Sequence, residues 1–330
     1  MTRFIVSVVM AAVCITAVTA DFDPYEMNGG LVAAVAGRDW SVLCADTRCS
    51  SGYNILQRNH VSSRLWVASS AAVGADTDDD DDSISSWISA DGSIAMESTT
   101  TKPVTDWNSQ PSESVDQDSH VSTSLLKEAP VMIASAGCQA DCEALKRLVR
   151  ADLRAARYFG EGGAATTSPD AVATLLSQML YSRRGFPFYS FCVVAGLGES
   201  AASAGQVFVY DAVGSYEQVA VASAGTGREL LQPILDRQFR TLLKAKPTAD
   251  ATRSSRQSKN GLIVQTPPGA IPSVTVDCTK EEAVSILADA YRSVSEREIG
   301  VGDQVVFCVL QRKADGKVEC QIIRYPLKQH

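Results

Sequence analysis

The chain has 330 residues, of which 45% are hydrophobic and 21% charged, with a formal net charge of −8. This acidic balance argues against a nucleic-acid-binding protein, which normally presents a basic face. Only three histidines are present, His60, His120 and His330, so we do not expect a histidine metal cluster or a histidine-dependent hydrolytic triad.

The first 20 residues have the pattern of a leader or pro-segment. Arg3 precedes an apolar run at 4–18 that ends in small residues, as in a secretory signal. The run is short for a membrane span. A pro-segment or N-terminal extension is the competing interpretation, and 21–330 hold the folded part in either case.

Strands are expected at 31–36 and 40–45, because two apolar runs flank the tight-turn sequence at 37–39. Shorter extended stretches follow at 53–57 and 64–68. Residues 69–127 are then rich in Ser, Thr and Asp, including an aspartate run at 78–82. We interpret this segment as a disordered acidic insert that accounts for the whole net negative charge of the chain, since the remaining residues are close to neutral. A calcium site is the sharper alternative, but the run lacks the alternating ligands and turn glycine of a calcium-binding loop.

Helical periodicity returns after a strand at 131–135. One helix is expected at 140–158, and a second begins with Ser168 as N-cap and Pro169 in its first turn. The second helix ends near Tyr181, Arg183 and Arg184, where the cations suit the helix dipole. A contact of these arginines with a partner outside the chain is an equally weighted alternative. Strands are expected next at 189–196, 206–210 and 217–222.

Two further helices are expected at 227–243 and 280–296, the latter opened by a capping box from Thr279 to Glu282. The stretch between them, 244–272, is basic and rich in proline, and we interpret it as a surface loop. Strands at 304–310 and 318–325 close the chain. Paired helices between runs of antiparallel strands predict an α+β fold, a four-layer αββα sandwich in one domain.

Nine cysteines are present, most of them within apolar runs, which is typical of buried free thiols in a reducing compartment. Cys138 and Cys142 are spaced for one helix face, but no further ligands complete a zinc set. Gly225 and Gly227 suggest a phosphate loop only weakly, because the lysine of a P-loop is missing. We therefore expect no metal and no cofactor.

Several motifs resemble those of 20S proteasome beta subunits. They are NGGLVAAVAG with the Asp46-Thr47-Arg48 turn, LYSRRGFPFYSFCVVAGL at 180–197, VFVYDAVGSYEQVA at 207–220, LLQPILD at 230–236 and SEREIGVGDQVVFCVL at 295–310. The resemblance covers about 21–68, 128–243 and 273–325. It implies the N-terminal-nucleophile hydrolase fold, in which catalytic members use an N-terminal Thr activated by its own amine and a nearby Lys.

The resemblance implies that this chain is not an enzyme. Counting back from Asp46 places the nucleophile at Gly30, and the Lys position falls at Ser63 or Arg64. The remaining degenerate positions are Thr226, Glu298 and Val301; Asp46 and Gly302 keep the pattern. For the Asp46-Thr47-Arg48 turn we expect an ion pair between the aspartate and the arginine.

The resemblance also implies partners and a location. These are the other beta subunits of a seven-membered ring, the alpha-ring subunits and the opposite beta ring, in cytoplasm and nucleus, with no nucleic acid and no membrane. Asp211 is expected to form a wall of a neighbouring catalytic subunit's pocket. Two alternatives remain: an autonomous secreted N-terminal-nucleophile amidase, and a secreted or membrane-tethered non-enzyme that rests on the leader alone.

Overall fold

The computed structural model describes residues 25–61, 64–69, 121–126, 129–159, 168–198, 204–240 and 275–328. The leader predicted at 1–20, most of the acidic insert predicted at 69–127 and the basic loop predicted at 244–272 lie outside these residues. No helix within the described residues is both long and apolar enough to cross a membrane.

The described elements alternate between groups of strands and pairs of helices. The strands are β1 (Leu31–Ala36), β2 (Trp40–Asp46), β3 (Cys49–Ser51), β4 (Asn54–Gln57), β5 (Leu65–Ser69), β6 (Val121–Leu126), β7 (Val131–Gly137), β8 (Ser190–Leu197), β9 (Gly205–Tyr210), β10 (Tyr216–Gln218), β11 (Val221–Gly225), β12 (Gln304–Arg312) and β13 (Val318–Pro326). The helices are α2 (Gln139–Phe159), α3 (Pro169–Ser182), α4 (Arg228–Arg240) and α5 (Lys280–Ser295).

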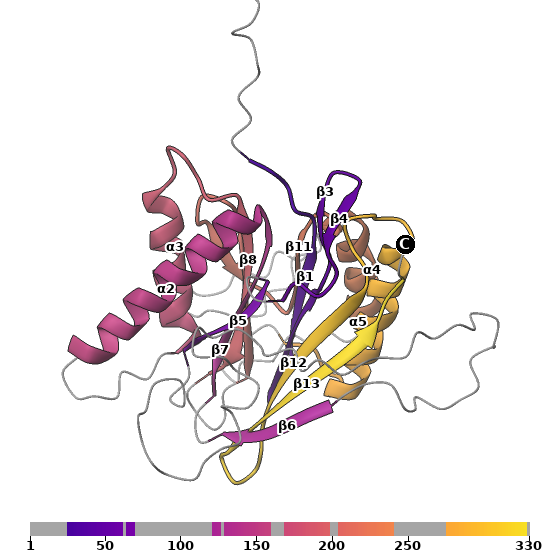
Figure 1. Cartoon of the computed structure of the whole chain (residues 1–330). Coiled ribbons are helices and arrows are strands. Elements are labelled where there is room, and N and C mark those ends of the chain that lie inside the picture. Colours follow the sequence, from indigo (N-terminus) through magenta and orange to yellow (C-terminus); the bar gives the residue numbers. More distant parts are fainter. Residues whose placement is uncertain are drawn as a thin grey trace, which may run out of the picture.

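Two antiparallel sheets form the centre of the molecule. A six-stranded sheet has the order β11-β1-β2-β12-β13-β6, and a five-stranded sheet has the order β10-β9-β8-β7-β5. Figure 1 shows α2 and α3 on one flank and α4 and α5 on the other, with the strands between them. The predicted mixture of helices and antiparallel strands is confirmed.

Alternation along the strands explains how the sheets pack. In β1, Val32 and Ala34 belong to an apolar cluster shared with β7 and β8 of the other sheet, whereas Leu31 and Val35 face α4 and α5. A third cluster joins the outer face of the five-stranded sheet to α2 and α3. Each buried Val or Leu contributes about 1.5–3 kcal/mol to folding, so these three interfaces dominate stability.

The predicted helix starts are confirmed. The Ser168 hydroxyl accepts a hydrogen bond from the backbone N–H of Ala171, with Pro169 in the first turn. At α5, Thr279 and Glu282 form both hydrogen bonds of the capping box. Each cap satisfies N–H groups that have no partner within the helix.

Two expectations are wrong. The acidic insert does not extend from 69 to 127, because Ser69 ends β5 and 121–126 form β6. Strand β6 pairs with β13 along its whole length, and Leu126 is buried. This pairing satisfies backbone groups that β13 would otherwise leave at a sheet edge.

The single strand expected at 217–222 is two strands, since the chain crosses there from the five-stranded to the six-stranded sheet.

Candidate functional site

The residues expected at the degenerate catalytic positions surround the start of β1. Gly30 immediately precedes this strand and is buried, with a φ of 96°. Its N–H donates to the carbonyl oxygen of Gly300 over 3.1 Å, and its own carbonyl accepts from the N–H of Thr226 over 3.0 Å. The loop after α5 and the turn before α4 therefore meet at Gly30.

The side chain of Arg64 occupies the space beside Gly30. A Cβ placed on Gly30 would lie 1.0 Å from Nη1 of Arg64 and 2.1 Å from its Cζ. Glycine is thus required by two independent facts, the positive φ and this steric contact. No side chain at position 30 fits unless Arg64 moves.

Arg64 joins the N-terminal segment to β2. Its guanidinium donates to the carbonyl oxygens of Asn28 over 3.1 Å and Gly29 over 3.2 Å, and also to that of Arg48. Nη1 lies 3.4 Å from Oδ1 of Asp46, and both side chains are almost entirely buried. Arg64 is one of the two positions that the sequence left open; Ser63 lies outside the described residues.

Asp46 lies at the end of β2, between β1 and the loop after α5. Oδ1 accepts from the N–H of Leu31 over 2.9 Å, and Oδ2 accepts from the N–H of Gly302 over 3.3 Å. Burial raises the pKa of the carboxyl to about 6, while Arg64 and these N–H groups act in the opposite direction. The carboxylate is therefore mainly ionised at neutral pH. Its hydrogen bond from Leu31 fixes the start of β1.

The chain N-terminal to Gly30 is anchored in the fold. Asn28 is buried; its N–H donates to Gly137 over 3.0 Å, and its side-chain Oδ1 accepts from the N–H of Gln139 over 2.8 Å. Its Nδ2 donates to the carbonyl of Ser50 over 3.3 Å. Three hydrogen bonds of Asn28 therefore hold the segment that leads to Gly30.

The later degenerate positions divide into two groups. Thr226 and Glu298 both approach Gly300: Oε1 of Glu298 accepts from the N–H of Gly300 over 3.2 Å, and Oγ1 of Thr226 would be 3.3 Å from a Cβ there. Val301 is fully buried in the apolar cluster with α4 and α5, so it contributes packing and no polar atom. Position 225 also has no room for a side chain, since a Cβ there would lie 2.1 Å from the carbonyl oxygen of Gly30.

The expected ion pair within the Asp46-Thr47-Arg48 turn is wrong. Arg48 is fully buried and instead binds Asp303 with two hydrogen bonds, from Nε over 2.9 Å and from Nη2 over 3.1 Å. Arg58 also donates to Asp303, over 2.6 Å. The turn directs Asp46 and Arg48 to different partners, and Asp303 is the residue that sequence reasoning missed. Its position directly after Gly302 was the available signal.

Asp211 lies away from these residues, in the turn between β9 and β10. Its exposed carboxylate accepts from the N–H of Val213 over 3.0 Å and from the N–H of Ser215 over 2.8 Å, both through Oδ1. The turn packs on α3, where Ser177 donates to the carbonyl of Gly214 over 2.6 Å. Asp211 therefore shapes its own turn, whatever it contacts outside the chain.

Comparison with known proteins agrees with this geometry. A family model described as "Proteasome subunit" matches residues 123–254. The chain is 29% identical to the proteasome subunit beta type-1 of Arabidopsis thaliana over 306 residues, covering 92% of this chain and 97% of that protein. The chain is therefore similar to proteasome beta type-1 subunits over most of its length.

Other relatives show the same coverage. The proteasome subunit beta type-1 of Drosophila melanogaster is 27% identical, with 88% of this chain and 86% of that protein covered. A probable proteasome subunit beta type-6 of Schizosaccharomyces pombe is 25% identical, with 94% and 98% covered. The similarity to proteasome beta subunits therefore extends over the whole range from Asn28 to Gly302 that contributes residues to the candidate site.

Proposed function

We propose that this chain is a non-catalytic structural subunit of the 20S proteasome core beta ring, acting in ATP- and ubiquitin-dependent protein degradation. The observation that carries the proposal is the occupation of the side-chain space at Gly30 by Arg64. The full-length similarity to beta type-1 subunits supplies the assembly to which such a subunit belongs.

Each component of threonine catalysis has a substitute that cannot perform the step. Gly30 has no hydroxyl, so no covalent intermediate forms at this position. The aligned cation, Arg64, has a guanidinium that is not deprotonated in proteins and therefore cannot act as a base. The assignment of Gly30 to the position that Thr occupies in catalytic subunits is part of this proposal.

The arrangement of two sheets between two helix pairs supports the four-layer αββα sandwich of the N-terminal-nucleophile hydrolases. The partners in the proposal are other beta subunits in a seven-membered ring, where this chain takes the sixth position, together with the alpha ring and the opposite beta ring. We place the particle in the cytoplasm and nucleus, and Asp211 in the wall of the adjacent catalytic subunit's pocket.

The autonomous amidase is not supported. Such an enzyme needs a Ser, Thr or Cys at its new N-terminus. Cleavage after Ala20 exposes Asp21, and cleavage before Gly30 exposes Gly. Neither residue provides a nucleophile of that kind.

Affinity purification from cells that produce this chain, tagged at its C-terminus, tests the proposed function. We expect the chain in high-mass particles that contain other proteasome subunits identified by mass spectrometry. Purified free chain should show no peptidase activity, and incorporation into particles should persist when a catalytic inhibitor blocks the active neighbours. Recovery only as a free chain, or a mature N-terminus that begins with Thr, Ser or Cys and hydrolyses peptides, would overturn the proposal.

A further inference from the structure

The end of α3 and the turn that leads into β8 form a surface of arginine and aromatic side chains. We define this arginine–aromatic surface as Tyr181, Arg183, Arg184 and Phe186. All residues from 181 to 186 are exposed, and the two rings keep 58% and 63% of their accessible area. Exposed apolar side chains that lie close together, unlike ones scattered singly, mark interaction sites.

The two guanidinium groups are stacked on aromatic rings. Arg184 lies over the ring of Tyr181, with Cζ 4.6 Å from its centroid, and Arg183 lies over the ring of Phe188 at 5.5 Å. Neither arginine forms an ion pair within the part of the chain that the structure describes. Stacking orients each guanidinium but uses few of its five N–H donors, so both retain donors for an external acceptor.

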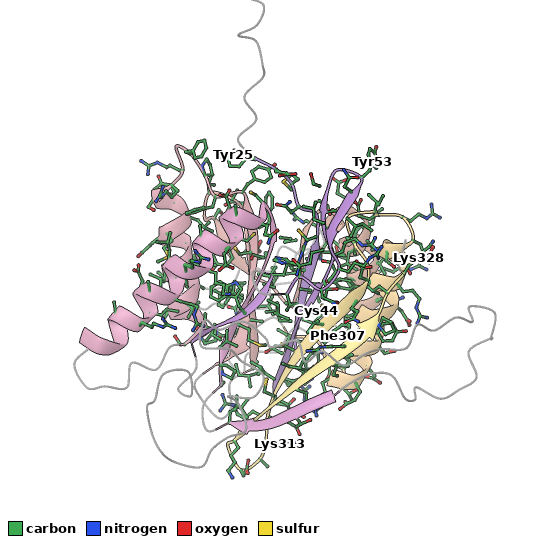
Figure 2. All side chains as sticks on the ribbon, in the orientation of Figure 1. Tyr25, Cys44, Tyr53, Phe307, Lys313 and Lys328 are labelled. Carbon is green, nitrogen blue, oxygen red and sulfur yellow. The ribbon has the colours of Figure 1, made fainter. Side chains whose placement is uncertain are left out.

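The surface is held in a fixed shape. The N–H groups of Arg183 and Arg184 donate to the carbonyls of Leu180 and Tyr181, each over 3.1 Å. Phe186 stacks on Tyr25 of the N-terminal segment at 5.4 Å, and the hydroxyl of Tyr25 donates to the carbonyl of Pro187 over 2.8 Å. Figure 2 shows Tyr25 at the end of the molecule opposite Lys313. A surface ordered before binding loses little conformational entropy when it binds.

The chemistry of the surface selects its partner. Tyr and Arg are enriched at the centres of protein–protein interfaces, where they dominate the binding energy. Arginine pairs with carboxylates through two parallel hydrogen bonds. We propose that the arginine–aromatic surface docks a carboxylate-bearing segment of a neighbouring subunit; this inference rests on the proposed function.

The position of the surface favours a neighbouring chain over this chain's own acidic segment. The turn that carries Asp211 packs on the same end of α3, since a Cβ on Gly214 would lie 3.1 Å from the nitrogen of Tyr181. The surface thus adjoins the residue proposed to face the adjacent subunit. Ser69, the last described residue before the acidic segment, pairs with Val131 at the start of β7. Ser190, beside the arginine–aromatic surface, pairs with Gly137 at the end of β7. Ser69 and the surface therefore lie at opposite ends of this strand.

Zero-length cross-linking in assembled particles tests the proposal. A carbodiimide couples carboxylates to primary amines and not to guanidinium groups, so wild-type particles are the matched control for Arg184→Lys. We expect a new amide bond between position 184 of the variant and an Asp or Glu of another subunit, identified by mass spectrometry. A bond to residues 70–120 of the same chain, or none at position 184, overturns the proposal.

Charge reversal gives a second readout that does not depend on cross-linking. Arg183→Glu combined with Arg184→Glu should lower incorporation into particles about tenfold, because like charges then meet across the contact. Lys317→Glu, at the exposed turn between β12 and β13, reverses a charge elsewhere and should leave incorporation unchanged. Incorporation of the double variant within twofold of wild type overturns the docking proposal, whereas absence of wild-type chain from particles overturns the proposed function itself.

Discussion

At the scale of single residues, the contact between Gly30 and Arg64 couples two positions that look independent in the sequence. A side chain at position 30 meets the guanidinium, and removal of the guanidinium leaves Asp46 buried without its cation. Breaking a buried ion pair by removing one partner costs about 3–5 kcal/mol. Introduction of any side chain at position 30 therefore requires a movement or a change of Arg64 as well.

A double-mutant cycle measures this coupling. We expect Gly30→Ala to lower the free energy of unfolding by about 3 kcal/mol or more, because it combines backbone strain with a collision. In the Arg64→Ala background the same change should cost about 1–2 kcal/mol less, since the space beside Gly30 is then empty. Denaturant unfolding of the purified chain gives all four values.

Gly316→Ala is the matched control for this cycle. Gly316 has a φ of 83°, and a Cβ there meets nothing within 4 Å. This variant therefore reports the cost of the backbone conformation alone, on the order of 1–2 kcal/mol. Two results would show that Arg64 does not fill the space beside Gly30. Gly30→Ala could lower the free energy of unfolding no more than Gly316→Ala does, or the effects of Gly30→Ala and Arg64→Ala on that free energy could be additive.

The sequence identified Gly30 and Asp46 but did not choose between Ser63 and Arg64. The lysine position is found by its residue spacing from Asp46, and β3 and β4 lie between the two. An insertion or deletion of one residue in that hairpin, relative to catalytic subunits, shifts every later position. The structure places Arg64 beside Asp46, with Nη1 3.4 Å from Oδ1, whereas Ser63 lies outside the described residues. The partner of Arg48 was missed because Asp303 is more than 250 residues away in the sequence, and only the fold brings the two residues together.

At the scale of elements, the helices were more predictable than the edges of the sheets. Helices α3 and α5 carry local signals in Ser168, Thr279 and Glu282, which cap them without help from the rest of the fold. Strand β6 carries no comparable signal, because its place depends on pairing with β13, almost 200 residues later. The break between β10 and β11 is likewise set by which sheet each half joins.

The turn between β9 and β10 carries the prediction for Asp211. Asp211→Asn keeps an oxygen that accepts from Val213 and Ser215, but it removes the charge. We expect this variant to assemble normally and to change the neighbouring subunit's relative cleavage of peptides with basic and acidic side chains about threefold or more, through loss of an electrostatic contact. Cleavage of a matched peptide series by purified particles is the measurement.

Asp211→Ala separates the two roles of this residue. It removes the charge and also both hydrogen bonds within the turn, which should lower stability by about 1–3 kcal/mol in total. If Asp211→Asn leaves the cleavage profile unchanged while Asp211→Ala only reduces assembly, the carboxylate acts on its own turn and not on a neighbour's pocket.

At the scale of the whole molecule, the cysteines report how completely the sheets and helices enclose the core. Of the eight cysteines in the described residues, seven are buried and free, and Cys278 is partly exposed. Burial raises the pKa of Cys44, Cys192 and Cys320 to about 12 and that of Cys278 to about 11. Because the thiolate is the reactive form, both access and ionisation protect the buried thiols.

Alkylation of the native chain, followed by peptide mass spectrometry, should therefore label Cys278 first among these eight residues. The seven buried cysteines should react only as fast as the chain opens, and all eight should react at similar rates in concentrated guanidinium chloride. Labelling of Cys278 should accelerate as pH rises toward 9, since its thiolate fraction grows tenfold per pH unit below its pKa. Cys278→Ser should abolish the fast phase at this site and leave the other rates unchanged. Native labelling of Cys44 at the rate of Cys278 would contradict the packing of the six-stranded sheet on α4 and α5, and equally fast labelling of Cys308 would contradict the packing of the two sheets on each other.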